Sequence, residues 1–196
     1  NSITVTPSAT TTYTVTGTDN NGCAGTASYT VTVKPLPNIN AGLDTNVCLG
    51  STVTLSATGG TSYTWNNGIS NGVSFVPSAT TTYTVVGTDA TNCFNTDSVI
   101  VTVNSIPTAP IITVTQPDCT SSIATIQFSG LPTTGNWTIN PGSYNGSGAT
   151  YTLNNQPAGT YNFTVKDTNL CTSSSTSATV IAAPTTPSAR SEERRV

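Results

Sequence analysis

The nine residues PSATTTYTV occur twice in the chain, at residues 7–15 and again, letter for letter, at residues 77–85. The match continues beyond them, because PSATTTYTVTGTDNNGC at 7–23 corresponds to PSATTTYTVVGTDATNC at 77–93, so that Pro7 matches Pro77 and Cys23 matches Cys93. A fixed period of this length indicates a repeated structural unit. The chain is therefore expected to fold as tandem copies of one small unit.

A third, more divergent copy reads PAGTYNFTVKDTNLC at residues 157–171. In every copy a tyrosine precedes an aspartate by six residues and a cysteine by ten, which gives the sets Tyr13, Asp19 and Cys23; Tyr83, Asp89 and Cys93; and Tyr161, Asp167 and Cys171. The constant spacing predicts that all three copies have the same local structure.

The repeated phrase has the alternation of a half-buried β-strand. Tyr13, Val15 and Gly17 alternate with threonines, so one set should face a core and the other set water. The Asp-Asn-Asn-Gly sequence that follows favours a tight turn, and residues 28–33 alternate again as a returning strand. Further short strands are predicted at residues 53–57, 62–65, 73–77, 111–115, 123–128, 136–139, 150–153, 161–165 and 177–181. The fold class predicted is all-β, with tandem small immunoglobulin-like β-sandwich domains of which the first is truncated.

Proline-containing stretches mark the expected boundaries, because proline ends a strand and stiffens a link. They divide the chain into residues 1–36, the C-terminal part of one sandwich repeat; residues 37–106, a complete repeat; residues 107–183, a second complete and divergent repeat; and residues 184–189, a linker.

The last seven residues, RSEERRV at 190–196, break the composition of the chain, of which only 7% is charged. They resemble the translation of a sequencing-adapter DNA, so we interpret them as an artefact and the chain as a translated metagenomic fragment. Residues 1–189 hold two lysines against six aspartates, a net charge of 2 − 6 = −4. This balance disfavours nucleic-acid binding, and no apolar run is long enough for membrane insertion.

The hairpin YTVTGTDNNGC, the stretch AGLDTNVCLGSTVTLSATGG at residues 41–60 and the phrase PAGTYNFTVKDTNLC resemble tandem immunoglobulin-like and PKD-like repeats of large secreted surface proteins of Bacteroidetes. The third unit is more similar to the repeats of gliding-motility adhesins. The resemblance implies an extracellular, cell-surface location and export by type IX secretion.

The five cysteines include no Cys-x-x-Cys pair, and the chain has no histidine, so metal and catalytic-thiol sites lack their partners. We expect disulfides formed in an oxidising compartment. The favoured pairing has one bond within each complete repeat, Cys48 with Cys93 and Cys119 with Cys171, because small domains gain most from internal cross-links. It leaves the partner of Cys23 upstream. The alternative is a bond between neighbouring repeats, Cys48 with Cys171, because the two cysteines of one sandwich would lie at opposite ends.

Candidate sites are few. No catalytic residue is predicted, because histidine is absent, no glutamate lies outside the tail and the aspartates are scattered. Trp65 and Trp137 are expected to pack in the cores, with glycan stacking together with Tyr144 as the alternative. The aspartates of the repeated turn are expected to cap it rather than to bind calcium. Asp97-Ser98-Val99 resembles a bacterial O-glycosylation signal, which makes Ser98 a candidate acceptor.

These features predict a non-catalytic extracellular stalk or spacer of a large adhesive surface protein, with no cofactor. Its expected partners are neighbouring repeats and surface polysaccharide or host glycans. The alternative function is an accessory spacer or glycan-binding module of a secreted polysaccharide hydrolase.

Overall fold

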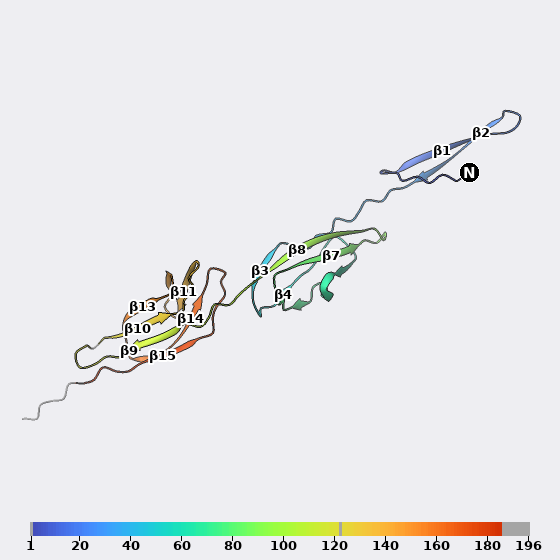
Figure 1. Ribbon diagram of the computed structural model, residues 1–196. Coiled ribbons are helices and arrows are strands. Elements are labelled where there is room, and N and C mark those ends of the chain that lie inside the picture. Colours follow the sequence, from blue (N-terminus) through green and yellow to red (C-terminus); the bar gives the residue numbers. More distant parts are fainter. Residues whose placement is uncertain (1, 122, 186–196) are drawn as a thin grey trace, which may run out of the picture. The chain divides into compact units, whose positions relative to one another are not determined.

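The computed structural model describes residues 2–121 and 123–185, which form an all-β protein (Figure 1). Within those ranges there is one 3-10 turn, at Asn66–Gly68, and no α-helix. The described residues group into two compact units, one within Asn1–Asp44, Val53–Phe75 and Thr82–Ile100 and the other within Thr45–Thr52, Val76–Thr81 and Val101–Val196. The predicted fold class is confirmed. The expected tail at 190–196 and most of the expected linker at 184–189 lie outside the described residues.

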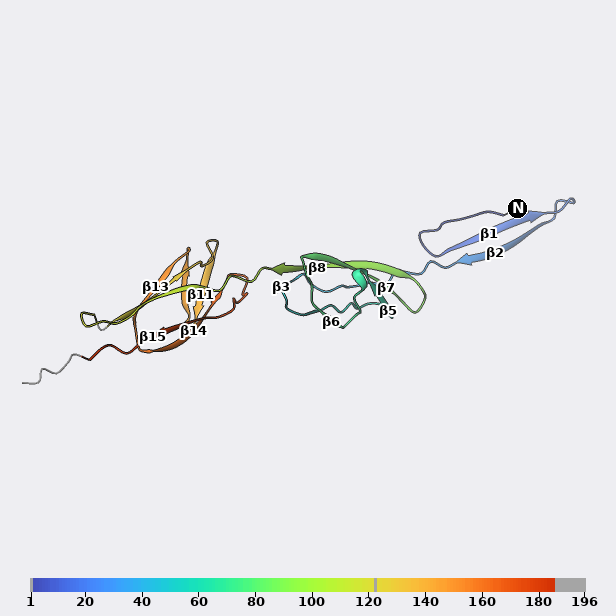
Figure 2. The same cartoon turned by 60° about the horizontal axis from the view of Figure 1, so that its bottom comes forward.

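The first repeated phrase forms an antiparallel hairpin of β1 (Thr11–Thr18) and β2 (Ala24–Val31), as predicted (Figure 2). The strands pair without interruption from Thr11 opposite Val31 to Thr18 opposite Ala24. The predicted burial of one face is wrong here, because Tyr13 is 36% exposed and Val15 is 66% exposed. Alternation produced the strand, but no second layer covers it among the described residues.

The remaining strands of the first unit enclose a small core. β4 (Val53–Thr54) pairs with β6 (Ser74–Phe75), and β5 (Ser62–Trp65) pairs with β7 (Thr81–Thr88), both antiparallel. The buried apolar side chains of this unit are Ile39, Ala41, Leu55, Ala57, Trp65, Tyr83, Val85 and Val99. On β7 the predicted alternation is confirmed, with Tyr83 and Val85 inside and Val86 more exposed.

The eleven-residue strand β8 (Phe94–Asn104) follows the second copy of the turn and lies beside β7 in a four-stranded sheet of order β3-β8-β7-β5. β3 (Thr45–Cys48) pairs with the far end of β8 in parallel, with Thr45 opposite Val101 and Cys48 opposite Asn104. This register places Cys48 level with the last residue of β8.

The second unit contains two sheets. One has the order β13-β10-β9 and the other the order β12-β11-β14-β15. Their bounds are β9 (Ile111–Thr115), β10 (Ala124–Ser129), β11 (Asn136–Asn140), β12 (Tyr144–Ser147), β13 (Tyr151–Gln156), β14 (Gly159–Lys166) and β15 (Thr176–Val180). One cluster of buried side chains joins both sheets, since Ile126, Phe128 and Leu153 of the first pack with Trp137 and Phe163 of the second. The unit is a β-sandwich.

Two strands were missing from the sequence prediction, β3 and β12. Both have only four residues, and neither has a clear apolar alternation. β3 is held by its parallel pairing with β8, and β12 by pairing with β11. Neither pairing is visible in the local sequence.

Candidate functional site

The repeated aspartate organises the turn that carries a cysteine in each copy. One carboxylate oxygen of Asp89 accepts the backbone N–H of Thr91 at 2.7 Å and that of Cys93 at 3.0 Å. The Asp19 carboxylate accepts the N–H groups of residues 21 and 23 at 2.9 and 2.8 Å, and the Asp167 carboxylate those of residues 169 and 171 at 3.0 and 2.9 Å. The prediction that these aspartates cap the turn is confirmed.

Backbone geometry completes the same turn in all three copies. The aspartate N–H donates to the carbonyl of the cysteine four residues later, at 2.9–3.0 Å. The residue before each cysteine has a positive φ, 83° at Gly22, 60° at Asn92 and 66° at Leu170. Glycine and asparagine adopt such angles readily, whereas a leucine there departs from the usual preference. The shared hydrogen bonds therefore impose the turn even where the sequence does not favour it.

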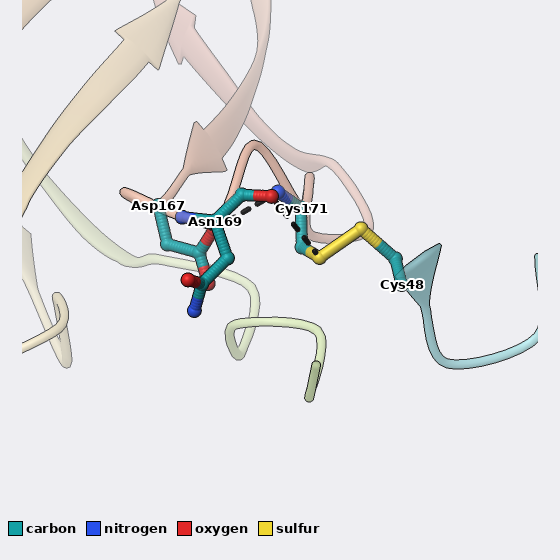
Figure 3. The surroundings of a disulfide bond; sticks show 4 residues. All are labelled: Cys48, Asp167, Asn169 and Cys171. Carbon is teal, nitrogen blue, oxygen red and sulfur yellow. Dashed lines mark hydrogen bonds between the residues drawn. A yellow bond between two sulfur atoms is a disulfide. The ribbon is translucent and has the colours of Figure 1, made fainter. Parts of the chain in front are cut away.

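A disulfide joins Cys48, at the end of β3, to Cys171 in the third copy of the turn (Figure 3). The two Cα atoms are 5.6 Å apart, within the usual range for a disulfide. In Figure 3 the Asp167 carboxylate holds the N–H of Cys171, and the Cys171 sulfur also lies 3.8 Å from the Asn169 carbonyl oxygen. The turn thus orients the sulfur that forms the bond.

The favoured pairing, Cys48 with Cys93 and Cys119 with Cys171, is wrong, and the alternative is the observed one. Cys93 immediately precedes the start of β8, whereas Cys48 lies level with its end. Eleven residues of strand span about 35 Å, far beyond the reach of a disulfide. The two cysteines therefore lie at opposite ends of β8, which is the physical reason that the pairing of Cys48 with Cys93 fails.

A side chain that the sequence prediction missed shows the same separation in the second unit. The Gln116 amide donates to the Thr179 carbonyl at 2.8 Å and accepts the Ile181 N–H at 2.9 Å. Thr179 pairs with Thr160 at the start of β14, so Gln116 holds the chain just before Cys119 near that end of the strand. Cys171 follows the other end of β14. Among the described residues, Cys23, Cys93 and Cys119 are free thiols; Cys93 is partly exposed and the other two are exposed.

The two tryptophans are core residues. Trp65 is 5% exposed and its indole N–H donates to the Asn71 side chain at 3.1 Å. Trp137 is 2% exposed and its N–H donates to the Gly148 carbonyl at 2.9 Å. Gly146 lies opposite Trp137 on β12, and a Cβ there would collide with the indole ring.

Glycan stacking by Trp65 and Trp137 is therefore contradicted, because neither ring has a face open to a sugar. Tyr144 is half-buried, and its ring centroid lies 6.1 Å from that of Tyr151. Tyr151 in turn makes an edge contact with Trp137 at 5.5 Å. Tyr144 thus packs at the margin of an aromatic cluster, and its part in glycan binding stays a prediction.

Ser98 is exposed on β8, as a modification site requires. Its neighbour Asp97 accepts the backbone N–H of Ala41 at 2.8 Å. Hydrogen bonds from the N–H groups of Ala41 and, secondarily, Ser98 lower the pKa of the Asp97 carboxyl below its ordinary value. The Asp97 carboxylate therefore has a structural role, since it holds the backbone at Ala41. Glycosylation of Ser98 stays a prediction.

No three His, Cys, Asp or Glu side chains gather into a metal site within residues 2–121 and 123–185. Over the same part of the chain, no helix has the length and apolarity to cross a membrane. Among the described residues, the candidate site is Cys171 on its hydrogen-bonded turn, together with Cys48, to which it is covalently linked.

No protein-family model and no curated protein sequence matches the chain. Solved structures with similar chains include a Ca2+-stabilised adhesin that helps an Antarctic bacterium bind ice, at 14% identity and a TM-score of 0.42, covering 89% of this chain and 56% of the adhesin. The human desmocollin-1 ectodomain is 15% identical with a TM-score of 0.26, covering 85% and 41%.

A third similar structure is SGBP-B of the Bacteroides ovatus mixed-linkage glucan utilisation locus, solved in complex with a mixed-linkage heptasaccharide. It is 15% identical with a TM-score of 0.24, and the match covers 88% of this chain and 53% of the SGBP-B chain. The chain spans about half the length of these structures. At such identities and TM-scores they assign no ligand to this chain.

Proposed function

We propose that this chain is a non-catalytic structural segment of a large adhesive protein, in which tandem β repeats act as a stalk or spacer outside the cell. The proposed repeats are residues 1–36, 37–106 and 107–183. In this proposal the protein is a bacterial cell-surface protein of Bacteroidetes exported by type IX secretion. Its first partners are neighbouring repeats of the same chain, and surface polysaccharide or host glycans are partners of the whole protein.

The observation that carries the proposal is the Cys48–Cys171 disulfide. Its two cysteines belong to different proposed repeats and are 123 residues apart in sequence. A bond of this kind limits how far adjacent repeats can be pulled apart. Disulfides also persist in oxidising compartments, which supports a position outside the cytoplasm.

Stretching single molecules by their termini tests the spacer role. With the disulfide intact, the residues between Cys48 and Cys171 are bypassed and cannot lengthen the chain. An extended residue spans at most about 3.3–3.6 Å, so we expect complete unfolding of the reduced chain to add about 400 Å more length than that of the oxidised chain.

Cys48→Ser should behave as the reduced chain does under oxidising conditions, whereas the matched control Cys119→Ser should retain the shorter extension, because Cys119 lies outside the bond. Equal extension of the oxidised and reduced chains would show that the bond does not limit stretching, and the spacer proposal would lose its main support.

A further inference from the structure

The five cysteines fall into two positional classes. We name Cys23, Cys93 and Cys171 the turn cysteines, because each lies four residues after a turn aspartate that holds its N–H. We name Cys48 and Cys119 the leading cysteines. Each lies five residues before a strand, β4 at Val53 or β10 at Ala124, and precedes the core tryptophan of its own repeat. Each complete proposed repeat therefore has one leading and one turn cysteine.

The observed bond joins a leading cysteine to the turn cysteine of the next proposed repeat, Cys48 to Cys171. Within a repeat the two classes are kept apart, as the opposite ends of β8 show for Cys48 and Cys93. The backbone hydrogen bond that the turn aspartate accepts from Cys171 occurs again at Cys93, where the Asp89 carboxylate accepts the cysteine N–H at 3.0 Å compared with 2.9 Å. The sulfur contacts differ, because the Cys93 sulfur accepts the Thr91 hydroxyl at 3.4 Å. The turn of Cys93 thus has the same backbone hydrogen bonds as the turn whose cysteine forms the disulfide.

We propose that the bond is one step of a repeating disulfide ladder, in which every leading cysteine pairs with the turn cysteine of the following repeat. Under this rule Cys93 bonds to a leading cysteine on a repeat before it, and Cys119 bonds to a turn cysteine on a repeat after it. Cys23 has the same role as Cys93. The free thiols at these three positions are sites for covalent attachment of further repeats of the same type.

The thiols of Cys93 and Cys119 are accessible to such partners, because Cys93 is partly exposed and Cys119 is exposed. Each bond forms when two thiols lose two protons and two electrons to a disulfide oxidant. Oxidised glutathione can serve in vitro, where it is reduced to two glutathione thiols. The rule rests on the Cys48–Cys171 bond and is independent of whether the repeats act as a stalk.

The test extends the full chain at its N-terminus with a second copy of residues 37–70. Because Pro7 corresponds to Pro77, Asn1 corresponds to Asn71, and the added residues complete the first proposed repeat in register. They also add one leading cysteine. A protease that cleaves before aspartate places each original cysteine in its own peptide, at residues 19–43, 44–88, 89–96, 118–166 and 167–196.

After oxidation with glutathione, mass spectrometry should find the added cysteine linked to the 89–96 peptide that contains Cys93. The extended chain should then have two free thiols, Cys23 and Cys119, instead of the four that remain when only Cys48 and Cys171 are bonded. A control with serine in place of the added cysteine should retain all three. Linkage of the added cysteine to Cys23, or four free thiols after oxidation, would refute the ladder.

A second variant guards against misfolding of the added segment. A whole copy of residues 37–106, marked by Val73→Ile and Phe94→Tyr at exposed positions, is inserted between Ile106 and Pro107. The ladder requires Cys48 to leave Cys171 and bond to the inserted turn cysteine, while the inserted leading cysteine takes Cys171. Retention of the Cys48–Cys171 bond across the insert would contradict the rule.

Discussion

The hairpins β1–β2 and β7–β8 share the sequence Thr-Thr-Tyr-Thr-Val at the start of their first strands, yet these side chains have opposite surroundings. Tyr83 is 6% exposed and Val85 is fully buried, whereas Tyr13 is 36% exposed and Val15 is 66% exposed. The side chains that surround Tyr83 and Val85 on β7 come from earlier in the chain. The Phe75 ring lies 5.1 Å from Tyr83, and Trp65 lies opposite Val85 on β5.

The turns of the two hairpins are nevertheless alike. Asp19 and Asp89 each bind two backbone N–H groups through one carboxylate oxygen, at 2.9 and 2.8 Å in the first hairpin and at 2.7 and 3.0 Å in the second. The hairpin is thus a local structure that forms with or without a second layer. Burial, and the stability that it contributes, depends on residues of other strands.

The largest expected difference is at the shared tyrosine. Tyr83→Ala should lower the free energy of unfolding by about 3 kcal/mol, because it empties a packed site. Tyr13→Ala should change it by less than about 0.5 kcal/mol, because the ring is already exposed. Urea unfolding followed by Trp65 fluorescence, with Trp137→Phe in every variant, measures both.

The chain extended by residues 37–70 sharpens this comparison. In the extended chain an added tryptophan takes the position of Trp65, and Val5 takes that of Phe75. If these residues pack against β1 as Trp65 and Phe75 pack against β7, the cost of Tyr13→Ala should rise toward that of Tyr83→Ala. A cost that stays near zero would mean that the first hairpin is not an incomplete sandwich.

A smaller difference is expected at the shared glycine. A Cβ at Gly87 would collide with the Ile39 side chain, whereas a Cβ at Gly17 meets nothing within 4 Å. Gly87→Ala should therefore cost about 1–3 kcal/mol through overpacking. Gly17→Ala should be neutral or slightly stabilising, because alanine reduces the freedom of the unfolded chain. Comparison of urea midpoints distinguishes the two, and equal effects would contradict the difference in packing.

The smallest effect is expected from pH. The Thr91 hydroxyl, which donates to Asp89 at 2.9 Å, is the main cause of a pKa of Asp89 below its ordinary value of 3.8. The folded state therefore favours the carboxylate. The stabilisation is present above about pH 3.8 and is lost as pH falls through the lower pKa of the folded chain.

Urea midpoints measured from about pH 5 to about pH 2.5 should decline once the pH is below about 3.8. Thr91→Val should make this decline in urea midpoint smaller. The first hairpin has Asn21 at the corresponding position, which lacks a hydroxyl, so Asn21→Val is the matched control and should leave the decline unchanged. An unchanged decline in Thr91→Val would contradict the role of the hydroxyl.

The sequence was sufficient for the elements whose causes are local. Alternating tyrosine, valine and threonine predicted β1 and β7, and the Asp-to-Cys spacing predicted the shared turn. These depend on neighbouring residues and on backbone conformations that side chains favour within a few positions. The short strands β3 and β12 escaped prediction, because only their pairing with other strands holds them.

The tertiary structure alone decided which copy of Tyr-Thr-Val is buried, that Trp65 and Trp137 are closed to sugars, and that Cys48 bonds to Cys171. Sequence reasoning could state both cysteine pairings but not choose correctly between them. A disulfide requires Cα atoms within about 7 Å, and the register of β3 on β8 decided the matter by placing Cys48 at the opposite end of β8 from Cys93. Burial and disulfide pairing depend on distances in space, which an amino-acid pattern with a period of two residues does not encode.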